Sequence, residues 1–372
     1  MKILIISSIV WNFNRARPQE LTMSLARLEN NCVYIEPIKY TEKDENNISI
    51  RLKDISNNHI PDCINVVGRS SKLRKTIFFF LYENIKNISV LNKYKPDVII
   101  SNDPLMSIPL CLVCKIEKTP FIFDNLDDWV NMEKKIHIRL MLKYCILPFL
   151  YSFSTAITNT SYMLMEAAKK YNDKSFLVPN GVSIEFMNKF DEYITNNDSN
   201  KVHFIATLRD WYDFDLMFDV FSQFPDLELH IHGKGPLYTY LVEKSKSYSN
   251  IFIRGYLDPS LIHETIAESL FGILPLKLNE MNDSTSPIKL FDYWAAKKVV
   301  ISSSTYEMKK IGGGCLLFAN TKDEYLKNIR LILKNKVLRD TLGEKGYIRV
   351  KDTYNYKKIA ETFEKLCGKY AK

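Results

Sequence analysis

The sequence predicts an α/β protein made of two Rossmann-like domains. The chain has 372 residues, which is too long for one ordinary core and suits two domains of roughly 150–200 residues. Short apolar runs alternate with longer amphipathic ones, as in parallel sheets covered by helices. A polar, mostly uncharged stretch at residues 195–200 separates two such series and reads as a linker. Two halves joined in this way are expected to face each other across a cleft.

The expected elements divide between the two halves. Strands are expected in the first half at residues 2–8, 32–36, 98–101, 121–124, 156–158 and 175–178, with helices such as 19–28 and 72–92 between them. In the second half, strands are expected at residues 202–206, 227–232, 251–255, 272–276, 299–302 and 315–318. A helical tail is expected at 321–372. The predicted domains are therefore 1–190 and 201–352, followed by a last helical segment at 353–372.

Composition narrows the function classes. The net charge of +8 suits anionic partners, either phosphate-bearing ligands or an acidic membrane surface. No long Lys/Arg block of the kind that wraps nucleic acid is present, so no nucleic-acid partner is expected. The seven cysteines are scattered through apolar segments, and free thiols used this way indicate a reducing cytosol. The CxxC pair Cys111 and Cys114 is predicted to lie in the core and not to bind a metal. The N-terminus is too short in its apolar part for a signal peptide, and Pro148 argues against a transmembrane helix at 144–165.

Ligands of open α/β sheets bind beyond the carboxyl ends of the strands. The segment after the first strand lacks GxGxxG and carries Trp11, Asn12, Arg15 and Arg17. Such residues suit sugar hydroxyls or phosphate. A surface loop followed by a helix that begins near Pro18 explains the segment equally well.

Three carboxylates follow the strand at 121–124, at Asp124, Asp127 and Asp128, with Trp129 beside them. Like charges in a cleft raise one another's pKa, which prepares a general base. Alternatively, Asp127 or Asp128 caps the helix that starts near Trp129. The three acids together, next to an aromatic ring on which a sugar can stack, favour the functional interpretation.

Two turns carry weaker signals. Asn180-Gly181 forms a turn that tolerates positive φ and shapes a hinge. His230 and His232 point to one face of a strand that ends at Gly233, where the missing side chain permits close backbone approach. Their spacing could chelate a metal, but no third ligand is evident, so a ligand-lining loop is predicted instead.

The strongest local feature is the segment 282–296. A Ser/Thr run at 284–286 precedes Pro287, which is expected at the first helical position, and the helix start offers free N–H groups to an anion. Lys289 and Asp292 lie on one helix face, suited to a diphosphate and to ribose hydroxyls respectively. The alternative is an ordinary capped helix with a surface ion pair, but a cation in the first turn opposes the helix dipole.

These segments together resemble GT-B glycosyltransferases of the family-4 kind, in particular the branch of teichuronic-acid-type transferases and, more distantly, the xanthan glucuronosyltransferase. The resemblance covers nearly the whole chain. Its pieces are residues 11–19, 123–129, 178–182, 210–215, 229–233 and 287–293. The sequence departs from the family pattern of two glutamates eight residues apart, because Ser284 stands at the first position and Asp292 at the second. Arg209 lies near, but out of register with, the usual Arg and Lys pair.

The resemblance implies a donor held by the second domain, an acceptor held by the first, and a last helix that braces the first domain. The implied catalytic residues are Asp127 and Asp128. The predicted donor-binding residues are Arg209, His232, Gly233, Ser284, Thr285, Ser286, Lys289 and Asp292, and the predicted acceptor-binding residues are Trp11, Asn12, Arg15, Arg17 and Trp129. An aspartate base is needed if the anomeric centre inverts, whereas no enzyme base is obligatory if it is retained.

The expected protein is a metal-independent, hexosyltransferase-type enzyme without a cofactor. It moves a sugar from a UDP- or GDP-linked donor to a glycan or lipid-linked acceptor in cell-surface polysaccharide synthesis. Basic and apolar residues alternate at 72–81 and 137–153, which suits docking on an anionic inner membrane face, although both stretches equally suit core helices. Rival interpretations are a sugar-nucleotide epimerase and a non-catalytic partner subunit with the same fold.

Overall fold

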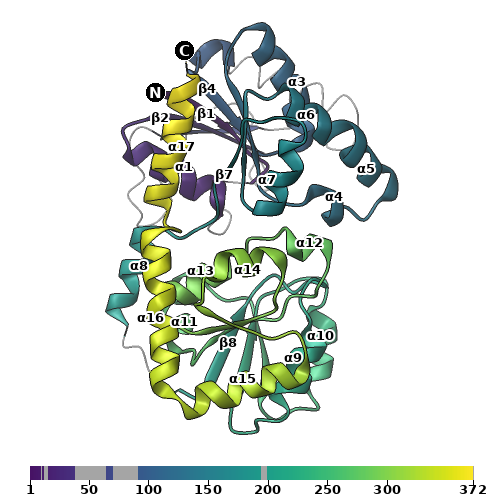
Figure 1. Ribbon diagram of the computed structural model, residues 1–372, viewed down its shortest axis with the longest axis vertical. Helices are drawn as coiled ribbons and strands as arrows, with labels where there is room; N and C mark the ends of the chain where they lie inside the picture. Colours follow the sequence, from purple (N-terminus) through teal and green to yellow (C-terminus); the bar gives the residue numbers. More distant parts are fainter. Residues whose placement is uncertain (10, 12–15, 38–63, 70–90, 194–198, 372) are drawn as a thin grey trace. The chain divides into compact units, whose positions relative to one another are not determined.

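The computed structural model describes the chain except for residues 10, 12–15, 38–63, 70–90, 194–198 and 372 (Figure 1). The chain divides into two compact units. Unit 1 comprises Met1–Pro179 and Tyr356–Lys372, and unit 2 comprises Asn180–Asn355. Residues 180–190, which the sequence placed in the first domain, belong to unit 2 because Met187 and Phe190 are buried in its core. The expected linker at 195–200 lies mostly outside the described residues.

Unit 1 is built on a seven-stranded parallel sheet in the order β3-β2-β1-β4-β5-β6-β7. The strand order turns back between β1 and β4, the place where the carboxyl ends of an open α/β sheet form a crevice. The strands are β1 (Lys2–Ile6), β2 (Asn31–Pro37), β3 (Ile64–Arg69), β4 (Val98–Ser101), β5 (Phe121–Asn125), β6 (Ala156–Asn159) and β7 (Ser175–Leu177).

The strand positions follow from hydrophobic runs that are buried on both faces, as helix-covered parallel strands require. All four residues of β4 and all five of β5 are buried. The sequence missed β3, because Asn65 and Gly68 interrupt its apolar run and lower its strand propensity. Its parallel pairing with β2 supplies the stability that the local sequence lacks.

Helices cover both faces of this sheet. On one face α1 and α17 lie side by side over a core that includes Leu25 and Phe363 (Figure 1). On the other face α3 and α6 cover a second core, in which Cys111 and Cys114 are buried as predicted for core thiols. The helices are α1 (Arg17–Arg27), α3 (Pro104–Ile116), α4 (Trp129–Met132), α5 (Ile136–Met141), the π-helix η1 (Leu142–Ile146), α6 (Leu147–Phe153), α7 (Tyr162–Lys169) and α17 (Tyr356–Tyr370).

Unit 2 contains two three-stranded parallel sheets, β10-β9-β8 and β11-β12-β13. They meet where the Leu270 amide donates to the Lys201 carbonyl at 2.7 Å. Figure 1 shows the strands of this unit surrounded by helices. The strands are β8 (Lys201–Ile205), β9 (Glu228–His232), β10 (Ile251–Gly255), β11 (Gly272–Leu274), β12 (Val300–Ser302) and β13 (Leu316–Phe318).

The helices of unit 2 pack around one large core. They are α8 (Ile184–Asn188), η2 (Lys189–Glu192), α9 (Phe214–Phe221), α10 (Tyr238–Ser245), η3 (Pro259–Leu261), α11 (Ile262–Glu268), α12 (Glu280–Asp283), α13 (Ile288–Ala295), α14 (Tyr306–Gly312), α15 (Lys322–Lys334) and α16 (Lys336–Asp352).

The position of α13 is fixed from two sides. Trp294 is fully buried against α16 at Gly346, where an added Cβ would lie 2.2 Å from the indole ring. On the sheet side, the Tyr293 hydroxyl donates to the backbone carbonyl of His203 on β8 at 2.6 Å. Because these contacts bind α13 to both a helix and a strand, its N-terminal end is held at a defined place beside the sheet.

Candidate active site

The start of α13 is an uncapped helix N-terminus. Pro287 has φ −76° and ψ 119°, so it occupies the N-cap position and not the first helical position that the sequence predicted. An extended ψ at Pro287 places the first helical residue at Ile288, and none of the described side chains caps the helix. The first N–H groups of α13 therefore face away from the helix without a side-chain acceptor, as in helix termini that bind anions.

Two of the predicted hydroxyl residues are engaged by the preceding helix. The Ser284 hydroxyl lies 3.1 and 3.0 Å from the Glu280 and Met281 carbonyls. The Thr285 hydroxyl donates to the Met281 carbonyl at 2.8 Å. Both side chains therefore close the C-terminal end of α12, which explains part of the Ser/Thr run without a ligand.

Ser286 behaves differently. It is 6% exposed, yet within the described part of the chain its hydroxyl has no hydrogen-bond partner. Its carbonyl accepts a hydrogen bond from the Asn180 amide at 2.9 Å, and the side-chain oxygen of Asn180 is likewise buried without a described partner. Each unsatisfied buried group costs about 1–3 kcal/mol. Two such groups beside an uncapped helix start mark a place prepared for a polar ligand.

Cations and aromatic rings line the neighbouring loop. Lys289 lies with its Nζ 6.0 Å from the centroid of the Tyr212 ring, and the Arg209 guanidinium lies 5.2 Å from the Trp211 ring. Tyr212 is held by a bridge to Leu276, which follows β11. Both predicted donor-binding cations therefore contact the aromatic pair at 211–212, which the sequence did not assign to the site.

Asp292 lies half-buried one turn beyond Lys289 on α13. Residues three apart on a helix share a face. A carboxylate here can accept hydrogen bonds from hydroxyl groups of a ligand that also meets the helix start. The arrangement matches the predicted pairing of an acid with a cation on one face, and the role of Asp292 stays a prediction.

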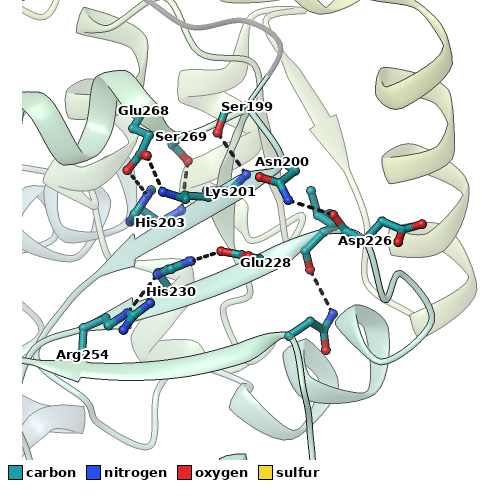
Figure 2. A network of polar contacts seen from close by, with 12 residues as sticks. Ser199, Asn200, Lys201, His203, Asp226, Glu228, His230, Arg254, Glu268 and Ser269 are labelled. Atoms are coloured by element: carbon teal, nitrogen blue, oxygen red, sulfur yellow. Dashed lines mark hydrogen bonds and ion pairs between the residues drawn. The ribbon is translucent and has the colours of Figure 1, made fainter.

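His232 hydrogen-bonds to His203, which belongs to a network of polar side chains on the sheet of β8, β9 and β10 (Figure 2). The Nδ1 atom of His203 lies 3.0 Å from Nε2 of His232, and the Nε2 atom of His203 lies 3.1 Å from Oε2 of Glu268. Because ionised Glu268 can only accept, His203 donates from Nε2, and its Nδ1 accepts from His232 Nε2. The sequence missed His203 and Glu268, since both stand alone in the chain and only the parallel pairing of β8 with β9 brings His203 beside His232.

His230 forms the second arm of the network. The Arg254 Nε donates to His230 Nδ1 at 3.0 Å, so Nε2 of that imidazole donates to Glu228 at 2.8 Å. Burial lowers the pKa of all three imidazoles, so they are neutral at pH 7, and their hydrogen-bond partners set their tautomers. Within the described chain no three His, Cys, Asp or Glu side chains are placed to hold a metal ion. The histidines hold the sheet together through these bonds.

Gly233 follows directly after this network with φ +129°. An added Cβ would lie 1.8 Å from the Ala206 carbonyl oxygen, so only glycine fits. The sequence explained this glycine by close backbone approach. The neighbour that approaches is the chain that follows β8, which is how the two carboxyl ends of β8 and β9 are held together.

Arg17 is not available to an acceptor, contrary to the prediction. It is 3% exposed, and its guanidinium donates to both carboxylate oxygens of Asp124, at 3.1 and 3.0 Å. A third nitrogen donates to the Pro179 carbonyl at 2.7 Å. The Thr158 hydroxyl also donates a hydrogen bond to the Asp124 carboxylate. This buried ion pair joins α1, β5, β6 and the end of unit 1.

The prediction for Trp11 is also wrong. It was predicted to bind acceptor, but its indole is 7% exposed and packs edge-on against Tyr34 at a centroid distance of 4.9 Å. The ring belongs to the core beneath α1. Asn12 and Arg15, the other predicted residues of this segment, lie outside the described residues.

Asp127 and Asp128 separate into two roles. Asp128 caps α4, because its carboxylate accepts from the Asn131 backbone amide at 3.0 Å. Asp127 has an exposed side chain, but the protein around its carboxylate removes part of its hydration. This desolvation and the neighbouring Asp128 charge raise the pKa of Asp127 to about 6. A carboxylate with this pKa is ionised at neutral pH and basic enough to take a proton.

Trp129 lies half-buried directly after these acids, against the core of unit 1. Its buried Nε1–H has no acceptor among the described residues. Asp127, with its raised pKa, and Trp129, with an indole N–H that has no described acceptor, thus follow the carboxyl end of β5 two residues apart.

Three comparisons bear on this arrangement. Residues 209–365 match the model of a family described as glycosyl transferase-like. None of the curated protein sequences matches the chain. Among solved structures, sucrose-phosphate synthase from Thermosynechococcus elongatus superposes with a TM-score of 0.77 at 13% identity, covering 99% of each chain.

HepE of Anabaena in complex with UDP gives a TM-score of 0.70 at 12% identity, over 99% of this chain and 100% of that one. WaaG, a glycosyltransferase involved in lipopolysaccharide biosynthesis, gives 0.65 at 13% identity, over 98% and 99%. The chain has the GT-B fold. In GT-B terms, the start of α13 belongs to the C-terminal Rossmann-like unit and the carboxyl end of β5 to the N-terminal one.

The histidine network predicts loss of stability in mild acid. Burial, followed by the charges of neighbouring imidazoles, lowers the pKa of His203 and lowers that of His232 to about 4. The unfolded chain therefore binds more protons below pH 6.5, and each such histidine lowers the free energy of unfolding by up to about 1.4 kcal/mol per pH unit. Stability is complete above pH 6.5 and declines as the pH falls toward 4.

Urea unfolding at pH 7.5, 6 and 5 measures this slope. His203→Asn is expected to flatten it, and the exposed His137→Gln is the matched control, expected to leave it unchanged. Equal slopes in His203→Asn and the unchanged protein would show that the buried network does not govern the pH dependence.

Proposed function

We propose that this protein is a metal-independent glycosyltransferase that moves a hexose from a UDP- or GDP-linked donor to a glycan or lipid-linked acceptor. The observation that carries the proposal is the uncapped start of α13 with the unsatisfied Ser286 hydroxyl and Asn180 oxygen beside it. HepE, which shares the fold, forms complexes with UDP and with UDP-glucose. The family match at 209–365 covers the same unit. Membership of the teichuronic-acid-type branch is part of this proposal.

The donor diphosphate is assigned to the helix start. Helix N–H groups, the Ser286 hydroxyl and the Lys289 ammonium all donate hydrogen bonds or positive charge, which is what a departing diphosphate requires. Arg209, which is exposed beside Trp211, is proposed as a second cation for the diphosphate. This set supplies positive charge from the protein itself, so the proposed reaction uses no metal and no cofactor.

Asp127 is proposed as the base that removes a proton from the acceptor hydroxyl in an inverting transfer. Its raised pKa matches a base that works near neutral pH. Asp128 is assigned to capping α4 and to raising the Asp127 pKa through its charge. Trp129 offers the acceptor sugar a ring and an N–H donor next to the base.

The acceptor is proposed to lie on an anionic membrane, with the protein bound peripherally on the cytoplasmic side. The helical stretch 136–153 has 18 residues and a mean hydropathy of 1.2, enough by length and composition to cross a membrane. One side of it, including Leu147 and Leu150, is buried in the core of unit 1. It is therefore placed along the protein surface, which suits a helix lying on a membrane and not one crossing it.

The opposite side of this stretch exposes apolar residues at helical spacing. Ile136 is 64% exposed, Leu140 47% and Tyr144 65%. We call these three residues the apolar face. Basic residues of the same stretch and of the loop before it accompany it, namely Lys134, Lys135, Arg139 and Lys143.

This charge pattern favours anionic lipid. The buried side of the stretch 137–153 agrees with the alternative of a core helix face, and the proposal concerns its exposed side. The other basic and apolar stretch, 72–81, lies outside the described residues. The name of WaaG places that relative of similar fold in lipopolysaccharide synthesis, which supports a role in cell-surface polysaccharide.

Ser286→Ala tests the donor site. Because the Ser286 hydroxyl has no described partner, removing it is expected to leave the melting temperature unchanged or raised. It should weaken UDP or GDP binding about three- to tenfold, through loss of one hydrogen bond to phosphate. Calorimetry on the purified full chain measures both. Ser260→Ala, an exposed serine of unit 2, is the control. No nucleotide binding by the unchanged protein would overturn the proposal and favour the non-catalytic partner subunit.

Asp127→Asn tests the base. Transfer of labelled sugar into a lipid extract from cells that make this protein should fall by about a hundredfold or more. In the unchanged protein, the rate should decline as the pH falls through about 6, since Asp127 then becomes protonated. Asp128→Asn keeps an oxygen that can cap α4, so its rate should stay within a few-fold. Full turnover by Asp127→Asn would sink the base and indicate a retaining route without an enzyme base.

Liposome flotation tests the membrane proposal. The protein is expected to float with vesicles of phosphatidylcholine and phosphatidylglycerol, and much less with phosphatidylcholine alone. The double variant Ile136→Ser/Tyr144→Ser should reduce the bound fraction about tenfold, because two apolar side chains no longer enter the lipid. Val337→Ser/Ile348→Ser removes exposed apolar residues of α16 and should bind like the unchanged protein. Equal binding by all three would refute the apolar face as the docking surface.

A further inference from the structure

We infer that Asn180 accepts a hydrogen bond from a hydroxyl of the sugar that the nucleotide donor carries. The inference rests on the proposed function and adds a specificity-determining residue that the sequence treated only as part of a hinge turn. Asn180 is the first residue of unit 2, and it is 9% exposed.

The orientation of the Asn180 side chain is set by chemistry. Its partner is the backbone carbonyl of Ser286, at 2.9 Å. A carbonyl oxygen only accepts, so the Asn180 NH2 group must face it, and the amide oxygen must point elsewhere. That oxygen is buried and has no donor among the described residues. A buried acceptor left open at this position lacks a structural explanation within the described chain.

The missing partner must carry a proton. An amide oxygen accepts and cannot donate, so phosphate oxygens, which are ionised at neutral pH, cannot satisfy it. Of the parts of a nucleotide sugar, the sugar and ribose hydroxyls and the N–H groups of the base can donate. The open Asn180 oxygen therefore selects one of these three parts.

The order of residues along α13 selects the sugar. Asp292 is the residue predicted to bind ribose. Lys289 lies about 4.5 Å nearer the helix start, at a rise of 1.5 Å per residue, and is assigned to the diphosphate. Ser286 and Asn180 lie beyond the first turn, on the side of Lys289 opposite to Asp292. Since the diphosphate joins ribose to sugar, a donor that runs along this helix brings its sugar to Asn180.

The backbone around Asn180 is rigid enough for such a contact. Val182 is fully buried, and its amide donates to the Tyr354 carbonyl at 3.0 Å. The Asn180 side chain is tied to the same loop that precedes α13. An acceptor that is held in place before the ligand arrives loses little entropy on binding.

The experiment compares the affinities for a nucleotide diphosphate and for its sugar conjugate. Calorimetry on the full chain measures the dissociation constants of UDP and UDP-glucose, and of GDP and GDP-mannose. For the pair that binds, Asn180→Ala should weaken the sugar nucleotide by about three- to tenfold more than the diphosphate. Asn328→Ala is the matched control, because it removes an amide that donates to the Phe318 carbonyl elsewhere in unit 2, and it should leave the ratio unchanged.

Asn180→Asp separates a ligand contact from a structural one. It keeps the acceptor and removes the bond to Ser286, so both compounds should weaken while their ratio stays near that of the unchanged protein. If Asn180→Ala leaves the ratio of the two dissociation constants unchanged, whether or not both compounds bind more weakly, this inference is overturned while the proposed function stands. Failure of the unchanged protein to bind any of the four compounds would contradict the proposed function, and this inference with it.

Discussion

A polar atom that is removed from water must find a hydrogen-bond partner, and this requirement separates the structural parts of the chain from its candidate site. The Arg17 guanidinium is buried, and each of its three nitrogens donates a hydrogen bond, two to Asp124 and one to the Pro179 carbonyl. The imidazoles of His203 and His230 are likewise matched by charged neighbours. Removing one partner from such a set leaves a buried group uncompensated, which costs far more than an exposed pair is worth.

The same requirement is unmet at the start of α13. There the fold leaves the Ser286 hydroxyl and the Asn180 oxygen without described partners, next to helix N–H groups that no side chain of the described residues caps. Trp294 and Tyr293 hold the rest of the helix firmly against α16 and β8. A rigid helix with an unsatisfied end provides what electrostatic catalysis needs, namely dipoles that are oriented before the substrate binds.

Much of the fold was predictable from the sequence. Parallel strands that are covered on both faces appear in the sequence as short apolar runs. The predicted bounds of β4 and β10 therefore equal the observed ones. β3 was not, because Asn65 and Gly68 hide its apolar pattern. The domain boundary was set too late, since the polar stretch at 195–200 stands out in composition. The chain enters unit 2 earlier, at Asn180, because buried residues such as Met187 already pack in its core.

The site was predictable in its residue types and less so in its contacts. The Ser/Thr run before a helix, with Lys289 after it, indicated an anion site from local rules alone. Arg17 has the composition of a ligand-binding residue, but its partner Asp124 is distant in the chain and becomes its neighbour only through the sheet. Which hydroxyl in the run is left open, and that Asn180 joins it, depends on tertiary packing that no local pattern encodes.

The central claim is that nucleotide diphosphate binds at the start of α13, and amide hydrogen exchange tests it most directly. Exchange in the full chain would be followed by mass spectrometry with and without saturating UDP or GDP. The account predicts slower exchange in peptides that cover residues 284–292, because the first amides of α13 and the loop before it become hydrogen-bonded to the ligand. Protection confined to other parts of the chain, with 284–292 unchanged, would contradict it.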